Sequence, residues 1–126
     1  MNRTLMLVLV TMLFSAEVFS AECVVLLHGL ARTSRSMSEL EEKLTQESFY
    51  VVNVDYPSRS KQILALSEIA VGDGLAQCRA ANASPVSYVT HSLGGILVRQ
   101  FYKNHAPVNV SRVVMLGPPN NGSEVV

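Results

Sequence analysis

A serine between an apolar stretch and two glycines is the residue of this sequence best placed to do chemistry. The segment reads Thr90-His91-Ser92-Leu93-Gly94-Gly95. Where a strand turns sharply into a helix, a serine at the turn presents its hydroxyl clear of the backbone, and small neighbours let strand and helix approach. Gly94 meets that need, whereas Thr90 brings a branched side chain. We interpret Ser92 as a nucleophile, with His91, Gly94 and Gly95 as its supporting turn.

A second motif lies at the end of an earlier apolar stretch and reads Leu27-His28-Gly29-Leu30. Acyl transfer passes through a tetrahedral oxyanion, which needs two backbone N–H donors held in place beforehand. One donor follows the nucleophile, and the other comes from a loop at the end of a neighbouring strand. The sequence therefore predicts an oxyanion hole formed by the N–H groups of Leu30 and Leu93, with His28 and Gly29 as supporting residues.

Both motifs follow apolar segments typical of buried strands, and the rest of the sequence alternates between strand and helix patterns. We expect strands at 23–27, 50–54, 86–90 and 110–116, and helices at 36–46, 61–80 and 94–105. Ser36 and Glu39 have the spacing of a capping box, while Gly72 and Gly74 weaken the middle of the second helix. The pattern predicts an α/β fold with a parallel sheet built from right-handed crossovers.

These motifs also resemble those of a known family. Two further segments carry the resemblance, Val54-Asp55-Tyr56-Pro57 and Leu116-Gly117-Pro118-Pro119-Asn120-Asn121-Gly122-Ser123. Together they resemble bacterial secreted lipases and esterases of the α/β-hydrolase superfamily, in order and spacing, over essentially all of residues 21–126. The resemblance implies the N-terminal portion of the hydrolase sheet, with about four strands. It also implies hydrolysis of small-molecule or lipid carboxylic esters through an acyl-enzyme on Ser92, without metal or organic cofactor.

The sequence departs from that family after the nucleophile, where an acid and then a general-base histidine should follow. After Ser92 it has one histidine, His105, at the far end of the expected helix, and one acid, Glu124. We therefore expect a C-terminally truncated chain, with 21–126 as a partial domain that has little or no activity alone. The alternative is a non-catalytic secreted α/β module that binds a ligand or partner at the strand ends.

The first twenty residues have the three-part pattern of a signal peptide: Arg3, an apolar run over 5–14, then small residues. We expect residues 1–20 to be removed and the mature chain to be periplasmic or secreted, with no stable membrane anchor. In such an oxidising compartment, Cys23 and Cys78 predict one disulfide. Two free buried thiols remain the alternative.

Composition excludes other functions. The ten basic and ten acidic side chains balance, so neither nucleic acid nor an anionic membrane surface is indicated as a partner. No metal site is expected, because neither cysteine has another cysteine or a histidine at ligand spacing.

Overall fold

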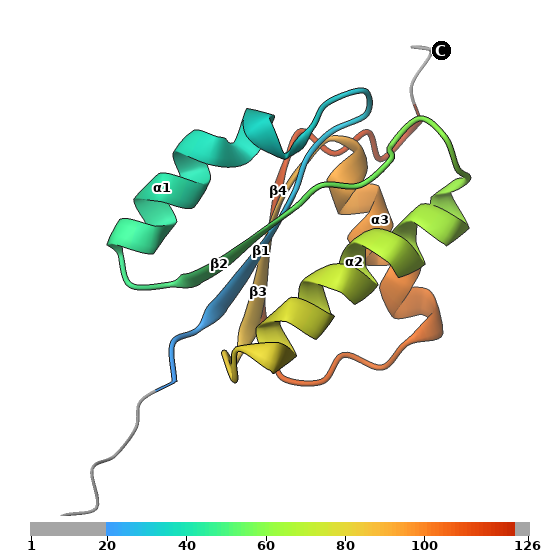
Figure 1. The fold of residues 1–126 in the computed structure, drawn as a ribbon. Helices are drawn as coiled ribbons and strands as arrows, with labels where there is room; N and C mark the ends of the chain where they lie inside the picture. Colours follow the sequence, from blue (N-terminus) through green and yellow to red (C-terminus); the bar gives the residue numbers. More distant parts are fainter. Residues whose placement is uncertain (1–19, 123–126) are drawn as a thin grey trace, which may run out of the picture.

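A computed structural model of the protein describes residues 20–122. Four parallel strands form one sheet in the order β2-β1-β3-β4, with β1 at Cys23–Leu27, β2 at Tyr50–Val54, β3 at Val86–His91 and β4 at Val110–Leu116. The helical segments are a 3₁₀ turn at Ser34–Met37, α1 at Ser38–Gln46, α2 at Ile63–Ala80 and α3 at Leu93–Asn104 (Figure 1). The predicted four-stranded α/β fold is confirmed. The expected signal peptide lies outside the described residues, apart from Ser20.

Strand β1 occupies the centre of the sheet, and all five of its side chains are buried. A continuous Val/Leu run suits this position, because a parallel strand with helices on both faces has no solvent-facing side. Leu27, its last residue, pairs with Val54 of β2 and Thr90 of β3. The carboxyl ends of these strands therefore meet at one edge of the sheet, which is where both predicted motifs begin.

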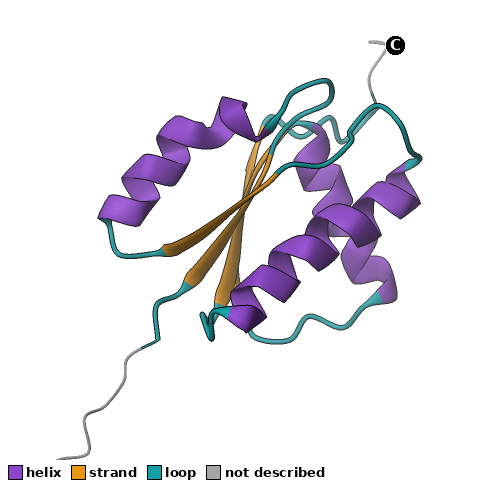
Figure 2. Cartoon of the chain, in the orientation of Figure 1, coloured by secondary structure: helices purple, strands orange, loops and turns teal. Residues whose placement is uncertain are grey.

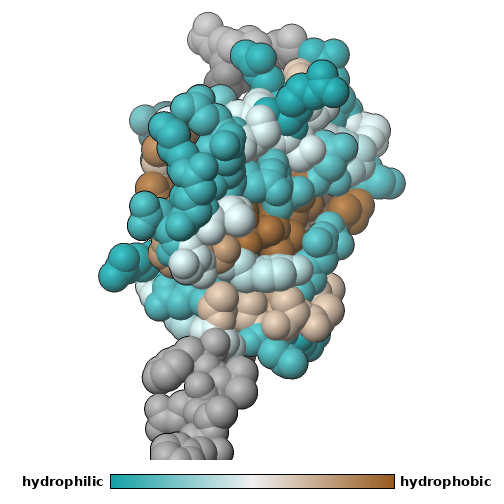
Figure 3. Space-filling view, turned by 60° about the vertical axis from the view of Figure 1, so that its left-hand side comes forward, coloured by the Kyte–Doolittle hydropathy of each residue, from teal (hydrophilic) through white to brown (hydrophobic). Residues whose placement is uncertain are grey.

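The helices form unequal layers on the two faces of the sheet. Helix α1 lies on one face, and α2 and α3 lie together on the other (Figures 1 and 2). Strand β4 is an edge strand, and Val113, Val114 and Leu116 on it are 40%, 48% and 47% exposed. In the view of Figure 3, hydrophobic side chains are visible in a hollow among hydrophilic neighbours. Among residues 20–122, no helix has the length and apolar character needed to cross a membrane.

A disulfide joins the sheet to the helix layer. Cys23 is the first residue of β1, Cys78 lies in the last turn of α2, and their Cα atoms are 5.8 Å apart. Both side chains are fully buried within the main hydrophobic core. The predicted pairing is confirmed, and the alternative of two free thiols is wrong.

The predicted capping box at Ser36 and Glu39 is wrong. The expected helix divides into the 3₁₀ turn and α1, so Ser36 lies inside the turn and Met37 stands at the N-cap. The Ser36 hydroxyl donates to the carbonyl of Thr33 at 2.8 Å. Because that carbonyl lies three residues back, the hydroxyl serves the 3₁₀ turn and leaves the first N–H groups of α1 without a side-chain cap.

Helix α2 continues unbroken through both of its glycines. A Cβ atom added at Gly74 would lie 2.6 Å from Cγ1 of Val25, so this glycine lets α2 rest directly on β1. A Cβ atom at Gly72 would meet nothing within 4 Å. Packing against the sheet therefore overrides the low helix propensity of the two residues.

Candidate active site

Ser92 alone makes the turn from β3, which ends at His91, to α3, which begins at Leu93. Its backbone has φ 50° and ψ −116°, a combination that residues with a side chain rarely adopt. The N–H of Ser92 donates to the carbonyl of Leu116 at 2.9 Å, which ties the turn to the end of β4. The sharp, strained turn that the sequence predicts is thus present at Ser92.

The two glycines that follow allow the start of α3 to lie against the sheet. A Cβ atom at Gly94 would lie 2.6 Å from the carbonyl oxygen of Leu27 and 2.9 Å from its Cβ, so the helix rests on the end of β1. A Cβ atom at Gly95 would lie 3.1 Å from Oγ1 of Thr90 and 3.2 Å from Sδ of Met115. A side chain at Gly94 would collide with β1, whereas a Cβ atom at Gly95 would fit only if its neighbours moved by a few tenths of an ångström.

Thr90, the poorest match to the expected turn, is accommodated beneath the helix. Its side chain is fully buried on the side of Gly95, and its Oγ1 has no hydrogen-bond partner among the described residues. Gly95 leaves the space that the branched side chain requires. Whether the turn can form therefore depends on Thr90 and Gly95 together.

The structure brings the second motif against this turn, although the two lie far apart in the sequence. A Cβ atom at Gly29 would lie 2.9 Å from Nδ1 of His91 and 3.4 Å from Cβ of Ser92. Leu93 is the first residue of α3, so its N–H has no acceptor within the helix. The N–H of Leu30 also has no acceptor in the part of the chain that the structure describes. Both N–H groups are therefore free of hydrogen-bond acceptors among residues 20–122.

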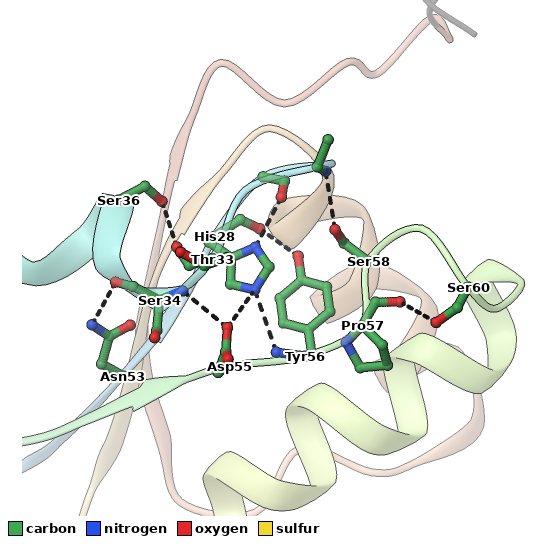
Figure 4. A network of polar contacts seen from close by, with 12 residues as sticks. His28, Thr33, Ser34, Ser36, Asn53, Asp55, Tyr56, Pro57, Ser58 and Ser60 are labelled. Atoms are coloured by element: carbon green, nitrogen blue, oxygen red, sulfur yellow. Dashed lines mark hydrogen bonds and ion pairs between the residues drawn. The ribbon is translucent and has the colours of Figure 1, made fainter.

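His28 holds the loop that carries Leu30 (Figure 4). Its ring is fully buried, with Nδ1 2.9 Å from the carbonyl oxygen of Gly29 and Nε2 3.3 Å from the backbone nitrogen of Tyr56. Since a carbonyl can only accept and a backbone N–H can only donate, the ring carries its proton on Nδ1. Both nitrogens are engaged, and the ring stacks on Tyr56 with centroids 4.0 Å apart. His28 is placed as a support for the loop, not as a base.

The segment after β2 completes this support, in a way that sequence reasoning did not foresee. The Tyr56 hydroxyl donates to the carbonyl of His28, and the Ser58 hydroxyl accepts from the N–H of Ala31 at 3.0 Å. Asp55 accepts from the N–H of Ser34 at 3.1 Å through Oδ1. Burial raises the pKa of the Tyr56 phenol well above its usual range, so it remains a donor. The signal in the sequence was a polar run directly after a strand that neighbours β1.

None of the three histidines forms a hydrogen bond with Ser92, and its Oγ has no partner among residues 20–122. The ring of His91 lies over Gly29. His105 lies beyond the other end of α3, about 18 Å along a helix of 12 residues, where its Nε2 is 2.8 Å from a Glu68 carboxylate oxygen. Glu124 lies outside the described residues. The described residues thus hold Ser92 at a strained turn but place no base beside it.

Metal ligands do not gather at this site. Across residues 20–122, no three histidine, cysteine, aspartate or glutamate side chains lie close enough together to hold an ion.

Comparison with solved structures identifies the fold. An esterase from Exiguobacterium antarcticum superimposes with a TM-score of 0.65 at 20% identity, over 80% of this chain and 39% of the esterase. An extracellular α/β-hydrolase from a Paenibacillus species, described as homologous in structure and function to tobacco salicylic acid binding protein 2, gives 0.55 at 19% identity, over 75% of this chain and 39% of that protein. No family model and no curated protein matches the sequence. The chain spans about two-fifths of the length of each structure, and it has the fold of the N-terminal portion of an α/β-hydrolase core.

Proposed function

We propose that this chain carries the nucleophile and the oxyanion hole of a secreted serine hydrolase that acts on carboxylic esters. The observation that carries the proposal is the backbone of Ser92, held at positive φ beside Gly29. The N–H groups of Leu93 and Leu30, which are unengaged among residues 20–122, are the donors that we propose for the oxyanion hole. Strained conformations of this kind persist only where the surroundings impose them, and they cluster at functional sites. The fold shared with an esterase adds an analogy of fold, not of residues.

In the proposed reaction, Oγ of Ser92 attacks the ester carbonyl carbon while a base removes the hydroxyl proton. The carbonyl oxygen becomes an oxyanion, which accepts hydrogen bonds from the N–H groups of Leu30 and Leu93. The bond from carbon to the alcohol oxygen then breaks, and the alcohol leaves with the proton. Water attacks the acyl-serine in the same manner and releases the acid. Small-molecule and lipid esters both satisfy this chemistry, and no cofactor takes part.

The base is the part of this reaction that residues 20–122 do not supply. Without it the Ser92 hydroxyl stays protonated and weakly nucleophilic. Catalysis by a site that retains only binding and an oxyanion hole amounts to about 10³ to 10⁴ over water. We therefore propose that this chain alone turns over slowly, and that a free base such as imidazole accelerates it. The buried disulfide supports a periplasmic or secreted location.

The test is hydrolysis of p-nitrophenyl acetate with and without imidazole. Since imidazole also cleaves this ester in solution, the relevant quantity is the rate of the chain minus the rate of Ser92→Ala at the same imidazole concentration. That difference should be small without imidazole and should grow with it. Ser111→Ala, an exposed serine on β4, is the matched control and should behave as the unchanged chain does. Equal rates for the unchanged chain and Ser92→Ala at every imidazole concentration would refute the proposal.

The absence of a base beside Ser92 among residues 20–122 also favours a second candidate, a non-catalytic binding module. Mass analysis after incubation with the same ester separates the two. A hydrolase without its base should accumulate an acyl group on Ser92, because deacylation needs the base as well. A binding module should leave the mass of the chain unchanged.

A further inference from the structure

A cleft of about 580 Å³ lies between the loop that follows β1 and the segment that follows β2. Residues 31–33 form one wall and residues 55–60 form the other. The two walls are joined by the hydrogen bond from the N–H of Ala31 to the Ser58 hydroxyl (Figure 4). The cleft therefore borders the same loop that carries the proposed oxyanion donor.

Each wall of the cleft contributes an arginine without an ion-pair partner. Arg32 and Arg59 line the cleft, and neither lies within ion-pair distance of a carboxylate among residues 20–122. We call the space between them the arginine cleft. Asp55 is the one acid in its lining, and Oδ1 of that carboxylate accepts from the N–H of Ser34. Since the whole sequence is balanced in charge, the excess of cations is a local property of this cleft.

A buried hydroxyl in the lining has a proton to donate. Ser58 is 7% exposed, and its Oγ accepts from the N–H of Ala31 at 3.0 Å. A serine hydroxyl can also donate one hydrogen bond, and no acceptor for it lies among residues 20–122. A buried donor without an acceptor is costly. Two guanidinium groups and this hydroxyl together form the set of donors that the oxygens of a carboxylate or a phosphate accept from.

The arginine cleft begins close to the candidate nucleophile. A Cβ atom at Gly29 would lie 3.4 Å from Cβ of Ser92. Ala31 lies two Cα steps of about 3.8 Å further along the chain, so the near end of the cleft is within about 12 Å of Ser92. Arg32 also lines a second cleft together with His91, the residue before Ser92. An ester held at Ser92 can therefore place a charged group on a short spacer against these long side chains.

From this charge and position, we propose that the arginine cleft binds an anionic group of the ester substrate. That group is a carboxylate or a phosphate, separated from the ester carbonyl by a short spacer. The inference rests on the proposed function, because it assigns a substrate class to the reaction of Ser92. Arg32 and Arg59 bind the anion and orient the ester, and the bonds that form and break are those of the ester hydrolysis described above.

The first measurement is binding, which needs no reaction at Ser92. The Ser92→Ala chain is titrated with monomethyl adipate, dimethyl adipate and inorganic phosphate, and binding is followed by nuclear magnetic resonance. Monomethyl adipate should bind at least tenfold more tightly than the uncharged dimethyl ester. Arg32→Gln or Arg59→Gln in the same background should weaken its binding severalfold. Arg79→Gln removes the same charge from the last turn of α2, beside the disulfide at the other edge of the sheet, and should leave binding unchanged.

The second measurement compares two reactive esters of equal length, mono-p-nitrophenyl adipate, which is an anion, and p-nitrophenyl methyl adipate, which is neutral. The rate at Ser92 is the rate of the chain minus the rate of Ser92→Ala at one fixed imidazole concentration. The anionic ester should react at least fivefold faster, and the ratio should fall as salt is added. Arg32→Gln or Arg59→Gln should bring the ratio of the two rates towards one, whereas Arg79→Gln should keep it. Circular dichroism checks that each variant is folded.

Equal binding of monomethyl and dimethyl adipate would overturn the inference, as would equal rates of the two p-nitrophenyl esters at Ser92. Binding of inorganic phosphate together with equal rates would assign the cleft to a free anion, and it would overturn the inference in the same way. Equal rates leave the proposed function standing. A chain in which Ser92 reacts with neither ester would instead refute the proposed function, and the binding comparison would still decide whether the cleft takes an anion.

Discussion

Replacing Ser92 by glycine should stabilise the fold, which is the reverse of what glycine does at most positions. The backbone at φ 50° and ψ −116° is the mirror image of an extended conformation, so glycine adopts it freely while serine and alanine do not. A side chain held in such a region costs about 1 to 3 kcal/mol. Glycine in turn loses about 0.5 to 1 kcal/mol through its freer unfolded chain. Ser92→Gly should therefore be more stable than Ser92→Ala by about 1 kcal/mol.

Urea unfolding followed by circular dichroism measures this difference. Both Ser92→Gly and Ser92→Ala lack the hydroxyl, so its loss does not affect the comparison. Ser111 on β4 provides the matched pair: it lies at a register shift between β3 and β4, but its φ is not positive, so it carries no such strain. There Ser111→Gly should be less stable than Ser111→Ala by about 0.5 to 1 kcal/mol. The sign of the glycine effect should thus be opposite at the two serines. If both pairs show the same destabilisation by glycine, the turn at Ser92 stores no strain, and the main support for a nucleophile at this position is lost.

Three further predictions concern packing, the disulfide and buried phenols. In thermal unfolding, Gly72→Ala should stabilise the fold by about 1 kcal/mol. Gly74→Ala, in the same helix, should be less stable than Gly72→Ala by about 1 to 3 kcal/mol, because its Cβ meets Val25. Equal stability of the two variants would contradict the close contact. Reduction of the disulfide, which spans 55 residues, should lower the free energy of unfolding by about 4 kcal/mol in the chain-entropy model. Urea unfolding curves with and without reductant measure this change. An unchanged midpoint would refute the bridge. Because burial raises the pKa of Tyr56 and Tyr88, both phenols should stay neutral just above pH 10 in the folded protein. Ultraviolet titration should show them ionising only with unfolding. The free energy of unfolding should fall as the pH rises above 10, the pKa of tyrosine in the unfolded chain.

Much of the fold could be predicted from local patterns. The Val/Leu run of β1 indicated a strand buried on both faces, and the positions of the four strands followed from similar runs. The disulfide could be predicted because the sequence has only two cysteines, which can form only one bridge within the chain. The capping box failed, since Ser36 has the right spacing for a cap but lies in a 3₁₀ turn whose carbonyl takes its hydroxyl. Such a turn depends on the following chain and is invisible to a four-residue pattern.

The candidate site was predictable in part. The glycines around Ser92 indicated a close approach of helix and strand. A Cβ atom would collide with Leu27 at Gly94 and would lie tightly against Thr90 and Met115 at Gly95. The support of the loop after β1 by Tyr56 and Ser58 could not be predicted, because it depends on β2 lying next to β1 and on side-chain directions beyond the strand end. The exposure of β4 likewise depends on which strands α1 covers, and the sequence of β4 itself does not show this.

The central claim, that Ser92 is the reactive serine of this chain, is tested most directly by a fluorophosphonate with mass mapping of every serine-containing peptide. Ser92 should be modified faster than all other serines, and its rate should rise about tenfold per pH unit in parallel with hydroxide, because no described base lies beside it. Added imidazole should raise that rate further. Modification of Ser92 no faster than that of the exposed Ser111 would contradict the claim.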